Sequence, residues 1–177
     1  MARTERILGD FGFLKVKAVV DPKNHCTGNG YQFAERKGVD SVAFICYDGS
    51  RLDDKFLINK EFTPPNGEFM YRAFGGSIDK NKTKEEIVKD EVLEEAGYDI
   101  DVAMITYYGM CFVSTQMNQN CYLYMVDVTG LKPVGRKPQN DIEAMAQPHW
   151  FNGADIYRMN DWKAAMILMR TCIACKY

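Results

Sequence analysis

The residues of this chain that are best suited to chemistry form an acidic group near its middle. Glu91, Glu94 and Glu95 lie within five consecutive positions, and the pair Gly75-Gly76 precedes them in the chain. Carboxylate oxygens are the ligands that hard cations such as Mg²⁺ prefer, and such ions usually bind substrate phosphates as well. A glycine turn lets the backbone approach a ligand closely. This combination favours a site that holds a divalent cation beside a phosphate.

A helix is expected to carry these glutamates. Thr83 and Glu86 have the spacing of a capping box, in which a hydroxyl residue and a carboxylate residue three positions later begin a helix. Gly97 lies where a glycine commonly ends one. The residues between contain neither proline nor glycine, so the pattern predicts one continuous helix from Thr83 to the glycine.

The acidic face of this helix is also its apolar face. At about 100° per residue, Glu91 and Glu95 fall in one sector and Glu94 lies at its edge. The apolar residues of that sector are Ile87, Val88 and Val92. A carboxylate is costly to bury unless it is paired or bound to a metal, which favours a metal site. The alternative is a solvated acidic helix with a different core face, and the helix pattern alone does not decide between the two.

The same stretch resembles the Nudix box of the Nudix hydrolases, Gly-x5-Glu-x7-Arg-Glu-U-x-Glu-Glu-x-Gly-U, where U is apolar. The residues that match this motif are Gly76, Glu91, Val92, Glu94, Glu95, Gly97 and Tyr98. Two positions depart from it, because Lys82 replaces the first glutamate and Asp90 replaces the arginine. In the family these two side chains usually form an ion pair between the loop and the helix. We therefore hypothesise that Lys82 and Asp90 form the same pair with the signs exchanged.

The resemblance extends to the subfamily that hydrolyses ADP-ribose and other nucleoside diphosphate sugars. The segments at 35–44, 56–65 and 131–136 resemble parts of that subfamily, although Thr63 stands where an arginine is expected. The resemblance implies an α/β fold, the Nudix-type α/β/α sandwich with a mixed sheet. It also implies one Nudix-like domain over residues 1–177, with an N-terminal β extension at 1–40 and a Nudix core at 41–177.

The resemblance further implies the residues of the active site. Glu91, Glu94 and Glu95, together with the backbone carbonyl of Gly75, are the expected ligands of Mg²⁺ or Mn²⁺ and the expected catalytic group. A catalytic base is expected from the acidic loop at 139–144, where Glu143 is preferred and Asp141 is the alternative. Both of these loop carboxylates could equally be solvated surface charges.

Substrate contacts are expected from five residues, each of which could instead be an ordinary surface or core residue. Arg36 stands where the subfamily binds the terminal ribose or a phosphate, and Lys60 and Arg72 could replace the arginine that is absent at Thr63. Tyr31 and Phe33 lie on the extension that helps to stack the base and is often exchanged between two subunits. By this analogy a homodimer is expected.

Two functions follow from the resemblance. The first is a metal-dependent pyrophosphatase that splits ADP-ribose or a related nucleoside diphosphate sugar into a nucleoside monophosphate and a sugar phosphate. The second is a catalytically inactive Nudix-fold module that binds or senses a nucleotide. Because a decayed site usually loses its ligands and this chain keeps the three glutamates, we favour the enzyme.

Composition agrees with a soluble globular domain. The 177 residues are 46% hydrophobic and 26% charged, with a net charge of −2, so no basic field draws the chain to nucleic acid or to an anionic membrane. No apolar run reaches the roughly 18 residues that span a bilayer, and the first residues lack a secretory pattern. A cytoplasmic location is therefore expected. The six cysteines are expected to be reduced thiols.

The remaining pattern predicts strands around two long helices. The expected strands are residues 11–20, 30–35, 41–47, 55–62, 69–74, 102–113, 121–128 and 149–151. A last helix is expected after Asn160 and Asp161, with a common core face. The residues of that expected face are Trp162, Ala165, Met166, Met169 and Ile173. His149 is expected to be a hydrogen-bonded structural histidine.

Overall fold

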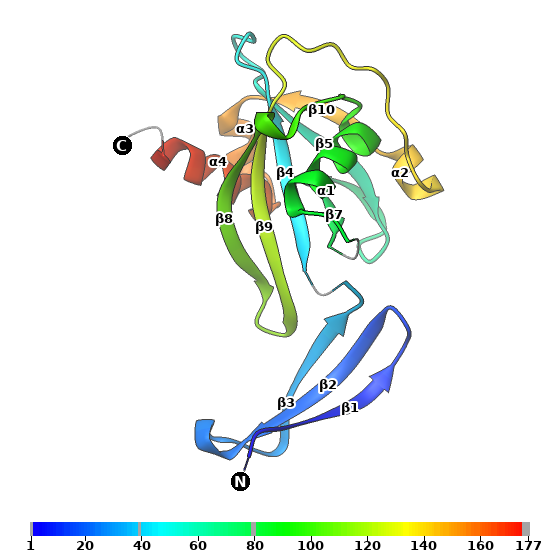
Figure 1. Cartoon of the computed structure of the whole chain (residues 1–177), viewed down its shortest axis with the longest axis vertical. Helices are drawn as coiled ribbons and strands as arrows, with labels where there is room; N and C mark the ends of the chain where they lie inside the picture. Colours follow the sequence, from blue (N-terminus) through cyan, green and yellow to red (C-terminus); the bar gives the residue numbers. More distant parts are fainter. Residues whose placement is uncertain (1, 39, 79–80, 175–177) are drawn as a thin grey trace.

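The chain has a mixed α/β architecture in the computed structural model, which describes residues 2–38, 40–78 and 81–174. Ten strands within these residues join in one sheet. Most of them form a body that carries helices, and three project from it (Figure 1). No described helix is long and apolar enough to cross a membrane.

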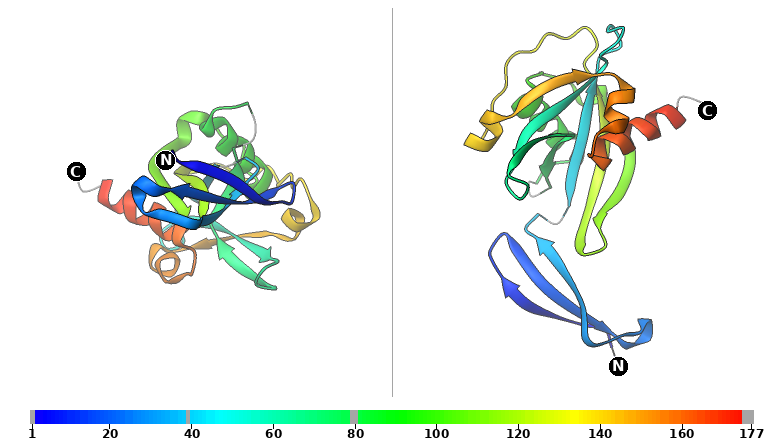
Figure 2. Two further views of the ribbon diagram at one scale, coloured as in Figure 1. Left: turned by 90° about the horizontal axis from the view of Figure 1, so that it is seen from below. Right: turned by 180° about the vertical axis from the view of Figure 1, so that it is seen from behind.

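The three projecting strands form the N-terminal sheet, which extends away from the body in Figure 1 and in the right view of Figure 2. They are β1 (Thr4–Asp10), β2 (Leu14–Asp21) and β3 (Cys26–Arg36), joined antiparallel. A short 3-10 turn, η1 (Pro22–Asn24), links the last two. The sheet meets the body where β3 pairs in parallel with the start of β9 (Met117–Asp127).

Two of these strands are predicted and one is not. The strands expected at 11–20 and 30–35 are confirmed as β2 and β3, although both boundaries shift. β1 was not expected. Six of its seven residues are exposed, so its sequence has no alternation of buried and exposed side chains by which it could be recognised.

β4 (Ser41–Tyr47) is the central strand of the body. β9 pairs with it in parallel along its whole length. On its other edge, β7 (Phe74–Ser77) pairs with its first half and β5 (Phe56–Thr63) with its last two residues, both antiparallel. A near-continuous apolar run is typical of a strand that is covered on both faces, and the strand expected at 41–47 is confirmed.

The other strands extend this framework. β6 (Glu68–Arg72) and β10 (Gln147–Phe151) both pair antiparallel with β5. β8 (Ile105–Ser114) pairs antiparallel with β9 and follows a 3-10 turn, η3 (Val102–Met104). The turn takes the first residues of the strand that was expected at 102–113.

Helices cover the two faces of the body, and alternate residues of β4 pack against them. Val42 and Phe44 pack in one buried cluster with Ile87 of α1 (Lys84–Glu91). Ala43 and Ile45 pack in a second cluster. That cluster also contains residues of α3 (Gly153–Arg158) and α4 (Trp162–Ala174). The predicted α/β/α sandwich with a mixed sheet is therefore confirmed, and the division of the chain near residue 40 stays a prediction.

The last helix is confirmed, but its predicted core face is wrong. The buried residues of α4 are Ala164, Ile167 and Leu168, whereas Trp162 is 39% exposed and Ile173 is 51% exposed. This helix is apolar around most of its circumference, so hydrophobic spacing alone does not show which side faces the sheet. α2 (Asp141–Met145) and α3 were not predicted, because five or six residues are too few to show a helical period.

The described cysteines are all free thiols, with Cys46 and Cys121 buried, as expected for small apolar residues. Cys175, the second cysteine of a CxxC pattern, lies outside the described residues. His149 differs from its prediction, since its buried Nε2 has no hydrogen-bond partner among the described residues. Its ring instead packs edge-on to Tyr71, with the ring centroids 5.7 Å apart.

Candidate active site

The helix that carries the glutamates begins as predicted. The Thr83 hydroxyl accepts a hydrogen bond from the Glu86 amide at 3.2 Å, and the Glu86 carboxylate accepts one from the Thr83 amide at 2.8 Å. This is the complete capping box. Gly97, with φ of 79°, ends the helix, and this left-handed conformation favours glycine.

The last turn of the helix is wider than the sequence pattern indicates. After α1 the chain continues as a π-helical turn, η2 (Val92–Ala96), in which the Gly97 amide donates to the carbonyl of Val92 at 2.8 Å. π turns are rare and are frequent at functional sites. This turn contains Glu94 and Glu95, so the widening changes how the carboxylates project relative to a regular helix.

Glu91 and Glu95 line a polar cavity of about 230 Å³ against the glycine turn. The other residues of this carboxylate cavity are Gly75, Gly76, Ser77, Gln139 and Glu143. Glu94 does not line it, and its Oε2 accepts a hydrogen bond from Gln139 Nε2 at 2.5 Å. Of the three predicted glutamate ligands, the structure therefore brings two into one cavity, while the third contacts the wall of that cavity.

Neither glycine of β7 leaves room for a side chain, because Gly76 lies against Glu91 and Gly75 lies against the backbone of β4. A Cβ atom on Gly76 would lie 2.2 Å from Glu91 Oε1, and one on Gly75 would lie 2.5 Å from the backbone oxygen of Val42. The Gly75 amide donates to Glu95 Oε2 at 3.1 Å. The role of the Gly75 carbonyl as a ligand stays a prediction.

Glu95 is buried and surrounded by negative charge. Its exposed fraction is 7%, and the pKa of this carboxyl is raised to about 8. Burial is the largest cause of the raised pKa, and the charges of Glu91, Glu61 and Glu143 add to it, whereas the hydrogen bond from the Gly75 amide opposes it. A divalent cation would offset this repulsion.

The donors of the carboxylate cavity fit a hard divalent cation. They are carboxylate and backbone oxygens, which Mg²⁺ and Mn²⁺ prefer, and one of them is a carboxylate that is costly to bury without a positive partner. Among the described residues, no three His, Cys, Asp or Glu side chains stand close enough together to hold an ion by themselves. A cation at this position would therefore complete its coordination with waters and substrate oxygens, as Mg²⁺ commonly does.

The loop that was expected to supply a base forms α2. Glu143 lines the carboxylate cavity, and its Oε2 and Oε1 accept hydrogen bonds from the Gln139 amide at 2.7 Å and from Asn140 Nδ2 at 2.6 Å. Arg136 anchors the short helix by donating to the carbonyls of Glu143 and Ala146. Asp141 does not line the cavity, so the geometry favours Glu143 of the two predicted bases.

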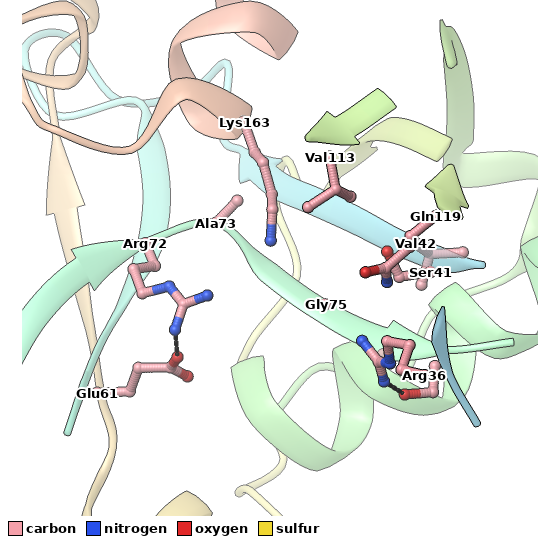
Figure 3. A pocket seen from close by; sticks show the side chains of 12 residues that line it. Arg36, Ser41, Val42, Glu61, Arg72, Ala73, Gly75, Val113, Gln119 and Lys163 are labelled. Carbon is pink, nitrogen blue, oxygen red and sulfur yellow. Dashed lines mark hydrogen bonds and ion pairs between the residues drawn. The ribbon is translucent and has the colours of Figure 1, made fainter. Parts of the chain in front are cut away.

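A second cavity, of about 320 Å³, shares Gly75, Gly76 and Ser77 with the first. We call it the basic cavity because three cationic side chains line it, as Figure 3 shows. These are Arg36, Arg72 and Lys163. The predictions named both arginines but not the lysine, which comes from the far end of the chain and has no motif around it.

The two arginines of the basic cavity are already paired. Arg72 Nη1 lies 2.6 Å from Glu61 Oε1, and Arg36 donates to the Ser77 hydroxyl. The Arg36 guanidinium also lies over the Phe13 ring, 5.2 Å from its centroid. The arginines are therefore held in place before a substrate binds.

The other predicted substrate residues lie elsewhere. Lys60 lines neither of the two cavities, and its ammonium lies 5.5 Å from the centroid of the Tyr71 ring. Tyr31 and Phe33 line a separate cavity of about 420 Å³ beside Phe112. The structure of one chain therefore does not bring these three residues to the carboxylates.

The exchanged ion pair at the start of the helix is present. Lys82 Nζ lies 2.6 Å from Asp90 Oδ2, and this hydrogen bond raises the pKa of Lys82. The contact joins the loop after β7 to the second turn of α1, which is the connection that the sequence hypothesis requires. Whether it braces the loop stays a prediction.

Comparison with known proteins supports the resemblance. No family model matches the chain. An uncharacterized Nudix hydrolase of Schizosaccharomyces pombe is 28% identical over 121 residues, which cover 64% of this chain. The match spans 57% of the length of that curated relative.

A solved structure described as an ADP compounds hydrolase superposes on nearly the whole chain. The TM-score is 0.70, and the match covers 99% of this chain and 96% of the other, at 14% sequence identity. At this identity the match shows the fold. The chain therefore has the fold of that hydrolase, and its sequence is similar to that of a Nudix hydrolase.

Proposed function

We propose that this protein is a Nudix hydrolase that uses Mg²⁺ or Mn²⁺ to cleave the pyrophosphate bond of ADP-ribose or a related nucleoside diphosphate sugar. The products are a nucleoside monophosphate and a sugar phosphate. The observation that carries this proposal is the meeting of Glu91, Glu95 and Glu143 at the Gly75-Gly76 turn, directly beside the basic cavity. The name of the solved structure with the same fold supports an ADP-containing substrate.

The carboxylate cavity is the proposed reaction centre. Glu91, Glu95 and the Gly75 carbonyl would hold the cation, and Glu94 would assist through its contact with Gln139. When bound, a divalent cation polarises phosphoryl oxygens and lowers the pKa of coordinated water. The Gly75 amide keeps the Glu95 carboxylate oriented toward this centre.

Glu143 is the proposed general base. Its carboxylate faces the carboxylate cavity and is oriented by the donors at Gln139 and Asn140. A carboxylate oxygen can accept more than one hydrogen bond, so these contacts leave it able to take the proton of an attacking water. Arg136 supports this position by donating to the carbonyls of Glu143 and Ala146.

The basic cavity is the proposed binding site for the rest of the diphosphate. Arg36 and Arg72 present fixed guanidinium groups, which suit phosphate oxygens. Phosphate oxygens that bind there extend over Gly75 and Gly76 into the carboxylate cavity, because both cavities share that turn. Holding the diphosphate across the turn would align it for in-line attack by water.

Turnover of defined substrates tests the proposal. The purified protein is incubated with Mg²⁺ or Mn²⁺ and, separately, with ADP-ribose, UDP-glucose, NADH, diadenosine polyphosphates and nucleoside triphosphates. We expect hydrolysis of at least one nucleoside diphosphate sugar and a loss of about 100-fold or more in kcat for Glu95→Gln, because the transition state loses a charged ligand. Glu68→Gln, on the exposed start of β6, is the matched control and should keep full activity.

The alternative is a module that binds a nucleotide without cleaving it. Calorimetric binding of a nucleotide without turnover of any compound in the panel would favour that function over the enzyme. Absence of Mg²⁺ and Mn²⁺ binding, with and without nucleotide, would contradict the proposed metal site itself.

We also propose the partner, the location and the oligomeric state of the protein. A nucleotide sugar is the expected partner, and the net charge of −2 gives no reason to expect nucleic acid or membrane binding. The free thiols agree with a reducing compartment such as the cytoplasm. A homodimer is expected through the N-terminal sheet.

A further inference from the structure

Lys163 differs from the other cations of the basic cavity, because its ammonium has no partner among the described residues. Arg72 is paired with Glu61 and Arg36 with Ser77, whereas no hydrogen bond or ion pair joins the Lys163 ammonium to any described residue. In Figure 3 the lysine side chain descends from α4 into the cavity, between Arg72 on one side and Val113 and Gln119 on the other. An unpaired ammonium in a polar cavity is positioned to bind an anion.

Asp161 holds this lysine in place. Its Oδ2 accepts a hydrogen bond from the Ala73 amide at 2.5 Å, and its Oδ1 accepts one from the Lys163 amide at 3.1 Å. The carboxylate is buried, with 9% of the residue exposed. It therefore ties the first turn of α4 to the chain between β6 and β7, close to Arg72, and fixes where the lysine enters the cavity.

The position of Lys163 is unfavourable for the helix itself. The N-terminal end of a helix carries partial positive charge, which favours acidic side chains and disfavours lysine. The first turn of α4 contains no acidic residue, and the Asp161 carboxylate that precedes it accepts hydrogen bonds from the amides of Ala73 and Lys163. A residue that destabilises the helix in which it lies is expected mainly at functional positions.

The composition of the basic cavity indicates which part of a substrate it takes. None of its lining residues is aromatic, so no ring is available for a base to stack on. The lining instead offers cations, the buried amide of Gln119, the Ser77 hydroxyl and the glycine turn. These groups suit a phosphate and sugar hydroxyls.

We propose that Lys163 is a specificity-determining residue whose ammonium binds the substrate phosphate that lies away from the carboxylate cavity, and that Asp161 is its positioning residue. This inference rests on the proposed function for the identity of the substrate, but not for the binding of a phosphate anion. With Arg36 and Arg72, Lys163 surrounds that phosphate from three elements, β3, β6 and α4. The chain would thereby bind one diphosphate with three cations, even though it has Thr63 at the position where an arginine is expected.

The test measures anion binding and turnover in the same set of proteins. Inorganic pyrophosphate is the probe, titrated by calorimetry with and without Mg²⁺ into the wild type, Lys163→Gln, Lys163→Arg and Lys23→Gln. Lys23 is exposed on η1 and is the matched control for the loss of one lysine charge. Melting temperatures are recorded for all four proteins.

We expect Lys163→Gln to weaken pyrophosphate binding by roughly tenfold or more, as for the loss of a charge-assisted hydrogen bond. Lys163→Arg should retain most of the affinity, and Lys23→Gln should match the wild type. The melting temperature of Lys163→Gln should be equal to that of the wild type or higher. Equal pyrophosphate affinity in Lys163→Gln and wild type would overturn the inference, as would no binding of pyrophosphate to the wild type.

The positioning role has its own measurement. If Asp161 acts through the lysine, Asp161→Asn weakens pyrophosphate binding in the wild type but has no further effect in the Lys163→Gln protein. Additive losses in the double variant would overturn the role of Asp161.

The proposed hydrolysis and the proposed role of Lys163 can be contradicted independently of each other. Lys163-dependent binding of pyrophosphate by a protein that hydrolyses none of the panel would disprove the proposed reaction while supporting this site. Turnover of ADP-ribose with the same kcat/KM in Lys163→Gln and wild type would support the reaction and overturn the inference.

Discussion

At the scale of single residues, the site is defined by a conflict between burial and charge at Glu95. Local spacing placed it on the apolar face of the helix but left a solvated acidic helix open, and its burial decides between the two. Lys163 could not be found in the same way. It lies 68 positions after Glu95 in the chain, and only the packing of α4 on β4 and the hydrogen bond from the Ala73 amide to Asp161 bring it to the same turn.

The raised pKa of Glu95 predicts a pH-dependent stability of the metal-free protein. Its folded pKa of about 8 lies above its ordinary value of 4.5, so the folded state binds the proton more tightly than the unfolded state. The contribution of this group is full below pH 4.5 and is lost as pH rises through 8. In EDTA we expect the melting temperature to fall by several degrees between pH 5 and pH 9.

Glu95→Gln separates this effect from other titrations. The amide cannot ionise, so the variant should show a flatter profile over the same range, whereas the exposed control Glu68→Gln should follow the wild type. Added Mg²⁺ should raise the melting temperature of the wild type most at high pH, where the carboxylate is ionised. A wild-type profile in EDTA that rises between pH 5 and pH 9 would contradict the assigned protonation.

At the scale of elements, the capping box and the terminal glycine of α1 were readable because they act over three or four residues. β1 is exposed and shows no such signal. α2 and α3 begin at the capping residues Asn140 and Asn152, but they are too short to show a helical period. The face of α4 was misjudged because its apolar residues lie on several sides. Which of them become buried is decided by the sheet and not by the helix.

The contact between the β7–α1 loop and α1 gives a prediction at this scale. Lys82 and Asp90 lie 2.6 Å apart, so Lys82→Glu and Asp90→Arg should each lower the melting temperature by placing like charges together. The double variant restores an opposite pair with the signs found in the Nudix box, and we expect it to recover most of the loss. Thermal unfolding of the four proteins at low and high salt measures the coupling. If the two single effects simply add, the contact does not brace the loop.

At the scale of the whole molecule, the body agrees with the predicted sandwich, while the N-terminal sheet projects from it and meets it where β3 pairs with β9. Its sequence resembles an extension that pairs with a second subunit, and a single chain leaves Tyr31 and Phe33 far from the carboxylates. The large apolar side chains that are exposed on and beside this sheet are Ile7, Leu8, Phe11, Phe13, Tyr31 and Phe112. Apolar patches of this kind commonly mark protein interfaces.

These exposed residues predict that the protein is a homodimer in solution. Light scattering after gel filtration should give about twice the chain mass of 20.2 kDa, because burying the apolar side chains of two N-terminal sheets against each other offsets the cost of association. Exchanging Ile7 and Phe11 for serine should shift the mass to that of the monomer. Leu52→Ser, at a residue that is 90% exposed on the loop between β4 and β5, is the control and should leave the dimer intact. A wild type that elutes at the mass of one chain at all tested concentrations would show that these apolar residues serve another purpose.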